Sequence, residues 1–180
     1  MNKKTLLLGF VLLTLIGCSY NQFYTPSPIT QDHPGGILKI VMLDVGQGQA
    51  ILINFPNNKW MLYDAGRSGE RLTDYLKQYN INELEWAIIS NLDADHAAGL
   101  IKGFDAIKVL NYGIPNVTCT TQTCYKLENG SGLEGSNNVF LHEGMTIDID
   151  PNVTIKVLNP SEPKTLSGDN DNSIVLDMKF

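Results

Sequence analysis

The chain has 180 residues, an apolar fraction of 43% and a formal net charge of −6 at pH 7. This length is enough for one domain with a sizeable core, and the composition is ordinary for a globular protein. The acidic balance gives no overall basic surface to neutralise phosphates, so it argues against generic binding of duplex nucleic acid.

Residues 1–17 have the pattern of a signal peptide. The positive segment MNKK precedes an apolar stretch, TLLLGFVLLTLI, that is too short to span a bilayer comfortably. The stretch ends in LIGCS, which resembles the lipobox of bacterial lipoproteins. We therefore expect removal of residues 1–17, lipidation of Cys18 and attachment to a membrane of the cell envelope, outside the cytoplasm. The alternatives are a plain secretory signal or a short anchor with an incidental cysteine.

Residues 18–36 read as a tether, because they are rich in Pro, Gly, Ser, Thr and Gln and show little apolar pattern. The domain then occupies residues 37–180. In this domain Cys119 and Cys124 form an even pair, and an exported protein lies in an oxidising compartment. We expect a local disulfide, with half of a zinc site as the alternative.

The domain begins with predicted strands, and predicted strands and helices then alternate along the chain. Short apolar, β-branched runs predict three strands, leucines and tyrosines at helical spacing predict a helix, and a run without alternation predicts a strand buried on both faces. A short helix, a strand, a long loop with the cysteine pair and three further β segments follow. In chain order these are 37–45, 49–55, 59–66, 70–80, 85–90, 97–104, 106–113, 114–138, 139–149, 153–160 and 172–180. This order indicates a mixed α/β layered architecture.

The chemistry-bearing residues gather in SNLDADH, residues 90–96, directly after the buried strand. Open α/β sheets place their sites at such carboxyl ends. Asp93, Asp95 and His96 offer carboxylates and an imidazole within four residues, a set that suits zinc, manganese or iron. The alternative is a polar loop in which Asp93 or Asp95 caps the following helix. A second acid, Asp64, follows another strand and could serve a turn or orient a ligand.

The order and spacing of several segments resemble the metallo-β-lactamase-fold hydrolase domain of the ComEC competence protein family. The segments are LDVGQGQAILI, MLYDAG, the run from Tyr75 to Leu100, and NDNSIVLDMKF. The resemblance implies an αββα sandwich with a dinuclear metal site. It further implies a metal-dependent hydrolase, with zinc or manganese as one or two ions and phosphodiester bonds of DNA as substrate.

Carried over residue by residue, the family's metal motif H-x-[HD]-x-D-H falls on Asn91, Asp93, Asp95 and His96. The resemblance assigns Asp93, Asp95 and His96 to metal binding, with Asp95 also catalytic. It places Asp64 beside the ligands. Asn91 stands where a histidine is expected, so we assign it to the surroundings of the ligands.

Two further departures concern Gln49, which stands where the family has Asp, and the end of the match. The family continues beyond NSIVL to Gly-Asp and His-His-Gly-Ser segments, so residues 37–180 match only the first part of the αββα sandwich. We therefore carry two hypotheses: an anchored metal-dependent hydrolase, and an inactive or truncated binding module on the same fold. Either would accommodate a partner chain that completes the fold.

Overall fold

The computed structural model describes residues 35–103, 107–130, 133, 135–161 and 170–180. They belong to one compact unit, Asp32–Phe180. The signal peptide and nearly all of the tether, including Cys18, lie outside the described residues. Among those that are described, no helix has the length and apolarity needed to cross a membrane.

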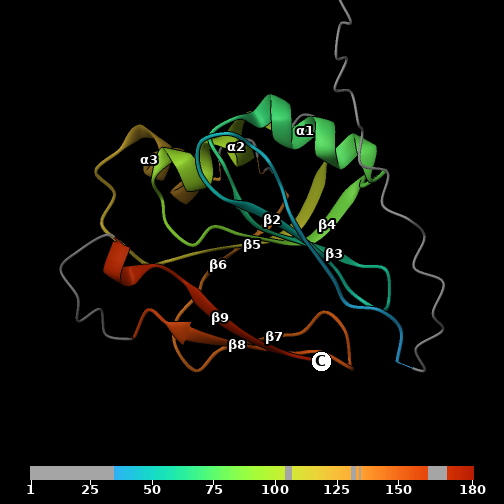
Figure 1. Ribbon diagram of the computed structural model, residues 1–180. Coiled ribbons are helices and arrows are strands. Elements are labelled where there is room, and N and C mark those ends of the chain that lie inside the picture. The colour runs from blue at the N-terminus through green and yellow to red at the C-terminus, as the bar shows by residue number, and fades with distance from the viewer. Residues whose placement is uncertain (1–34, 104–106, 131–132, 134, 162–169) are drawn as a thin grey trace, which may run out of the picture. The chain divides into compact units, whose positions relative to one another are not determined.

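The larger sheet has six strands in the order β1-β2-β3-β4-β5-β6 (Figure 1). The first three pair antiparallel, and β3 to β6 run parallel. A parallel pair needs a crossover, and helices provide those between β3 and β4 and between β4 and β5. The strands are β1 (Lys39–Met42), β2 (Ala50–Asn54), β3 (Trp60–Ala65), β4 (Glu83–Ile88), β5 (Lys108–Ile114) and β6 (Asn137–Phe140).

The smaller sheet contains β7 (Thr146–Ile147), β8 (Thr154–Asn159) and β9 (Val175–Lys179), all antiparallel, and a short 3-10 turn, η2 (Asn170–Asn172), precedes β9. In β8, buried Ile155 and Val157 alternate with exposed neighbours. This period of two is typical of a sheet with one face on a core and one in water.

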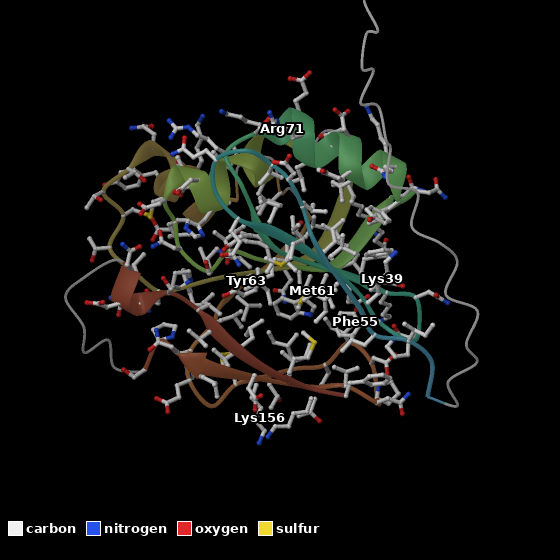
Figure 2. All side chains as sticks on the ribbon, in the orientation of Figure 1. Lys39, Phe55, Met61, Tyr63, Arg71 and Lys156 are labelled. Atoms are coloured by element: carbon white, nitrogen blue, oxygen red, sulfur yellow. A yellow bond between two sulfur atoms is a disulfide. The ribbon has the colours of Figure 1, made fainter. Side chains whose placement is uncertain are left out.

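Three helices, α1 (Gly69–Gln78), α2 (Ala94–Gly103) and α3 (Gln122–Glu128), cover the face of the larger sheet that points away from the smaller one (Figure 1). Apolar side chains fill both interfaces. One core lies between helices and sheet, and the other lies between the sheets, where Figure 2 labels Phe55 and Met61. The expected layered α/β arrangement is confirmed, with one helical layer and two sheets among the described residues.

Two local expectations were wrong. The stretch 139–149 is not one strand, because the chain leaves the larger sheet after β6, turns at Gly144 with φ of +87°, and enters the smaller sheet as β7. The loop with the cysteines also contains a helix, α3. The Thr121 side chain caps the helix by accepting a hydrogen bond from the backbone N–H of Cys124. The polar composition of the segment had favoured a loop.

Candidate metal site

The candidate site lies where β3 and β4, neighbours in the parallel part of the sheet, both end. Asp64 is near the end of β3, and Ser90 is the second residue after β4, in the connection to α2. This placement follows the expectation that polar residues gather at the carboxyl ends of parallel strands. The helix, however, begins at Ala94 rather than at Ala97. Asp95 and His96 therefore lie in its first turn.

Asp64 is the most enclosed charged residue of the site, with an exposed fraction of 0%. One carboxylate oxygen accepts a hydrogen bond from the Ser90 backbone N–H at 2.7 Å. The other accepts from the Ser90 hydroxyl at 2.7 Å and from His96 Nδ1 at 2.8 Å. These bonds satisfy a carboxylate that would otherwise be costly to bury.

His96 gains a fixed orientation from this contact. Because Nδ1 donates to Asp64, the other ring nitrogen, Nε2, is left facing away from the carboxylate and able to act as a ligand. A carboxylate behind the imidazole is the arrangement that holds metal-binding histidines in proteins. The Asp64 hydrogen bond also raises the pKa of His96 above its usual value, against the opposing effect of burial, with smaller contributions from Asp95 and Asp93.

Tyr63 and Ile174 connect this cluster to the smaller sheet. The Tyr63 hydroxyl donates to the Ile174 carbonyl at 2.5 Å, and the Ile174 backbone N–H donates to the Ser90 carbonyl at 2.9 Å. Burial, and next the charge of Asp64, raises the pKa of Tyr63 to about 12. The phenol therefore keeps its proton and its donor role at physiological pH.

Asn91 is buried, with an exposed fraction of 3%, and both ends of its amide are engaged. Its oxygen accepts from the Asp93 backbone N–H at 2.7 Å, and its nitrogen donates to the side-chain oxygen of Asn170 at 2.5 Å. The amide oxygen thus shapes its own loop. The assignment of Asn91 to the surroundings of the ligands stays a prediction.

The hairpin loop between β1 and β2 closes over the first turn of α2. The backbone N–H of Gln49, the residue that departs from the family pattern, donates to the Asp95 carbonyl at 3.3 Å, and the Gln49 carbonyl accepts from the Gly66 N–H at 2.8 Å. Gly48 has φ of +100°, and a Cβ there would meet the Asp95 carbonyl oxygen at 1.7 Å. Only glycine permits this approach.

The three expected ligands, Asp93, Asp95 and His96, fit a divalent ion in kind, since hard carboxylates and an oriented imidazole are zinc and manganese ligands. Asp93 is exposed, whereas Asp95 and His96 are half-buried. The structure does not gather them around one point. Within the part of the chain that it describes, no group of three or more His, Cys, Asp or Glu side chains is placed to hold an ion. Their assignment to a metal site therefore stays a prediction.

A pocket borders the exposed side of this loop. Its far wall is the segment after β5, which a disulfide between Cys119 and Cys124 closes, with the two Cα atoms 5.3 Å apart. The lining combines threonines and one carboxylate with apolar side chains, and it contains no basic side chain. The lining residues are Asn91, Leu92, Asp93, Pro115, Val117, Thr118, Thr120, Thr121 and Cys124.

The comparison with protein families decides the classification, because the model of the metallo-beta-lactamase superfamily matches residues 43–158, more than half of the chain. The chain belongs to this superfamily. Membership suggests a metal-dependent hydrolase and a divalent metal, in agreement with the donor set on α2. No curated protein matches the chain by sequence.

Solved structures share the fold at low sequence identity. A metallo-beta-lactamase HARLDQ motif mutant from Cronobacter sakazakii is 13% identical with a TM-score of 0.52, and the match covers 81% of this chain and 55% of that one. Zn²⁺-bound PqqB from Methylobacterium extorquens is 10% identical with a TM-score of 0.50, covering 73% and 48%. The chain thus spans about half the length of these structures. At this identity the likeness establishes the fold alone.

Two residues of the site were not predicted from the sequence. Ser90 donates twice to Asp64, and Asn170 accepts from Asn91. The abrupt change from apolar to polar at the end of β4 was a usable signal for Ser90. Asn170 lies far along the chain, in η2, and no local pattern connects it to Asn91.

Proposed function

We propose that the protein is a metal-dependent hydrolase of phosphodiester bonds, attached to a bacterial membrane through lipid on Cys18. The observation that supports this best is the Asp64–His96 contact at 2.8 Å, which orients the imidazole and leaves Nε2 facing away from Asp64. Asp93 and Asp95 lie within three residues of His96, at the start of α2. The likeness of the motif series to the ComEC hydrolase domain favours phosphodiesters, DNA included, as substrates.

In this proposal His96, Asp95 and Asp93 hold a zinc or manganese ion, and other donors fill its remaining positions. The bound ion would supply polarisation of a water molecule and neutralisation of phosphate charge. The chain's own residues do the rest. Asp64 keeps the His96 ring oriented, and a carboxylate oxygen of Asp95 receives the proton that the attacking water loses.

The charge of the chain and the lining of the pocket fit a metal-dependent reaction. The net charge of −6 repels a polyanionic substrate, and the lining of the pocket beside Asp93 has no basic residue. A bound cation would then be the main attraction for the phosphodiester. The pocket itself would receive an uncharged part of the substrate through the hydroxyls of Thr118 and Thr120.

A second candidate function is an inactive binding module. It is favoured by the engaged amide of Asn91 and by the absence, in the described part of the chain, of three gathered ligand side chains. A half-complete ligand set can bind an ion weakly and still fail to activate water. A partner chain that supplies further ligands would convert this module into the first candidate.

One experiment separates the candidates. The full chain, kept in detergent, is titrated with Zn²⁺ and with Mn²⁺ by calorimetry, and hydrolysis of bis(4-nitrophenyl) phosphate and of DNA is followed. Asp95→Ala is compared with Asp148→Ala. Asp148 is an exposed acid directly after β7, in the smaller sheet. Metal binding and turnover that Asp95→Ala alone abolishes support the hydrolase. Metal binding without turnover supports the module, and no binding of either ion contradicts both.

The anchor has its own test. Mass spectrometry of the N-terminal peptide from bacterial membranes should find a lipid-modified cysteine at Cys18 and no residues 1–17. A Cys18→Ser variant should leave the membrane fraction. An unmodified Cys18 in membrane-bound protein would contradict lipid anchoring.

A further inference from the structure

The free edge of the larger sheet is formed by β1, which pairs with β2 and with no other described strand. Its two most exposed side chains are apolar: Ile40 is 57% exposed and Met42 is 67% exposed. Both lie on the face that points towards the smaller sheet, since they pair with Ile53 and Ile51 of the core between the sheets. Their exposed fractions show that the smaller sheet leaves both side chains largely uncovered.

The backbone of the same residues is also unpaired on one side. The Leu43 N–H donates to the Ala50 carbonyl at 2.9 Å, so this pair is one of the hydrogen-bonded pairs with β2. Hydrogen-bonded and non-hydrogen-bonded pairs alternate along an antiparallel ladder. Lys39 and Val41 therefore bond to β2, whereas the N–H and C=O groups of Ile40 and Met42 face outward.

This edge carries few of the features that keep strands from pairing. It has no proline, no glycine and no bulge in Lys39–Met42, and its single charge is turned away. The Lys39 ammonium lies 5.0 Å from the centre of the Tyr79 ring, at the end of α1, on the helical face of the sheet. Ile40 and Met42 are left without a charged neighbour in the strand on their own face.

We propose that β1 pairs with β1 of a second copy of the chain, antiparallel about a two-fold axis at Val41. In this register the outward groups of Ile40 meet those of the partner's Met42, and the reverse pair is equivalent, so every outward group finds a bond. The exposed apolar side chains also become cross-strand neighbours.

Charge favours a second copy as the occupant of this edge. In the proposed register Lys39 comes opposite the partner's Leu43, next to the partner's Asp44. Asp44 lies on the helical face too, because its carboxylate is 3.6 Å from Arg71 of α1. Opposite charges thus approach on one face, and no like charges of the two strands are opposed.

The pairing would be weak in dilute solution. A single short strand pair falls below the roughly 1,200 Å² of a standard interface. Attachment of both copies to one membrane would raise their effective concentration and favour the dimer. The proposal does not depend on hydrolase activity, and its tests use none.

The register is tested by cross-linking the full chain in detergent. In the proposed dimer the two Val41 residues form a non-hydrogen-bonded pair, with Cβ atoms close enough for a disulfide. Val41→Cys should give a covalent dimer on mild oxidation. Lys156→Cys, on the outer face of the smaller sheet, is the control, and both variants keep Cys18. Equal cross-linking of the two variants, or none at Val41→Cys, would overturn the register.

The edge itself is tested by variants that block pairing. Met42→Pro removes one outward N–H and no bond to β2, and Ile40→Lys places a charge on the apolar face. By analytical ultracentrifugation, each should weaken the dimer at least about tenfold, a change of about 1.4 kcal/mol. Leu158→Lys, an exposed apolar residue of β8, should leave it unchanged. A monomeric parent chain, or equal weakening by Leu158→Lys, contradicts the proposal.

Discussion

Two regions of the segment from Ser90 to His96 are held very differently. Its two flanking residues, Ser90 and His96, bond to a carboxylate that is 0% exposed. Between them, the Asp93 side chain is exposed and borders a pocket. The fold thus fixes the orientation of the imidazole in advance. If Asp93 binds a ligand as proposed, the free-energy cost of ordering its side chain falls on the binding step.

The largest effect on stability is expected from removing the buried carboxylate of Asp64, which holds Ser90 and His96. Asp64→Ala leaves the Ser90 N–H, the Ser90 hydroxyl and His96 Nδ1 without their acceptor in a buried position. We expect a loss of about 3 kcal/mol or more in the free energy of unfolding, measured with urea. Asp148→Ala, an exposed acid, should change it by less than about 0.5 kcal/mol. Similar losses for the two variants would mean that the Asp64 contacts contribute little.

A smaller effect is expected where the β1–β2 loop closes on α2. Gly48→Ala combines a left-handed backbone, with φ of +100°, and a collision with the Asp95 carbonyl. Gly144 has a similar φ of +87°, and a Cβ there would have nothing within 4 Å. Gly144→Ala therefore measures the cost of the left-handed backbone without a collision. We expect about 1 kcal/mol for Gly144→Ala and about 1–3 kcal/mol more for Gly48→Ala in urea unfolding. Equal losses of unfolding free energy in the two variants would show that the loop moves to avoid the collision.

The pH dependence of stability probes the same contact between the imidazole and Asp64. Because the folded pKa of His96 is raised, the folded state binds its proton more tightly than the unfolded chain does. The stabilisation is complete below the unfolded pKa of about 6.5 and is lost as pH rises through the raised folded pKa. With a chelator present, His96→Gln should remove this part of the pH profile of unfolding. An unchanged profile would contradict the assignment.

The smallest effect on stability is expected at the exposed residue, Asp93. Asp93→Ala should change the free energy of unfolding by less than about 0.5 kcal/mol, because the side chain is exposed. If Asp93 binds metal, the same variant should weaken Zn²⁺ binding in calorimetry by about tenfold or more. A stable variant with unaltered metal affinity would remove Asp93 from the ligand set. Thr120→Ala, on the pocket wall, serves as the control.

Local patterns were enough to predict much of this fold. The strand runs and the helix at 70–80 follow from hydrophobic period. The place of Asp64 beside the later motif was implied by the family resemblance, because the local pattern left a turn role open. The switch of the chain from the larger to the smaller sheet between β6 and β7 did not follow, because both segments have similar β composition. Both segments contact the core between the sheets, and only their pairing distinguishes them: β6 pairs with β5, and β7 pairs with β8.

The site was predictable in its residue types and less so in its contacts. Short spacing within Asp93–His96 suggested the metal donors, and their role stays a prediction. The Asn91–Asn170 bond and the Ile174–Ser90 bond join residues about eighty positions apart. Such pairs depend on how the two sheets dock, which no window of local sequence contains.

The bonds of Ile174 have a consequence for the dynamics of the domain. This residue donates to the Ser90 carbonyl and accepts from the Tyr63 hydroxyl, so separation of β9 from the larger sheet breaks contacts on both sides of Asp64. The smaller sheet and the start of α2 should then open as a single cooperative unit. In native-state hydrogen exchange, the amide of Ser90 and those of β9 should share one opening free energy.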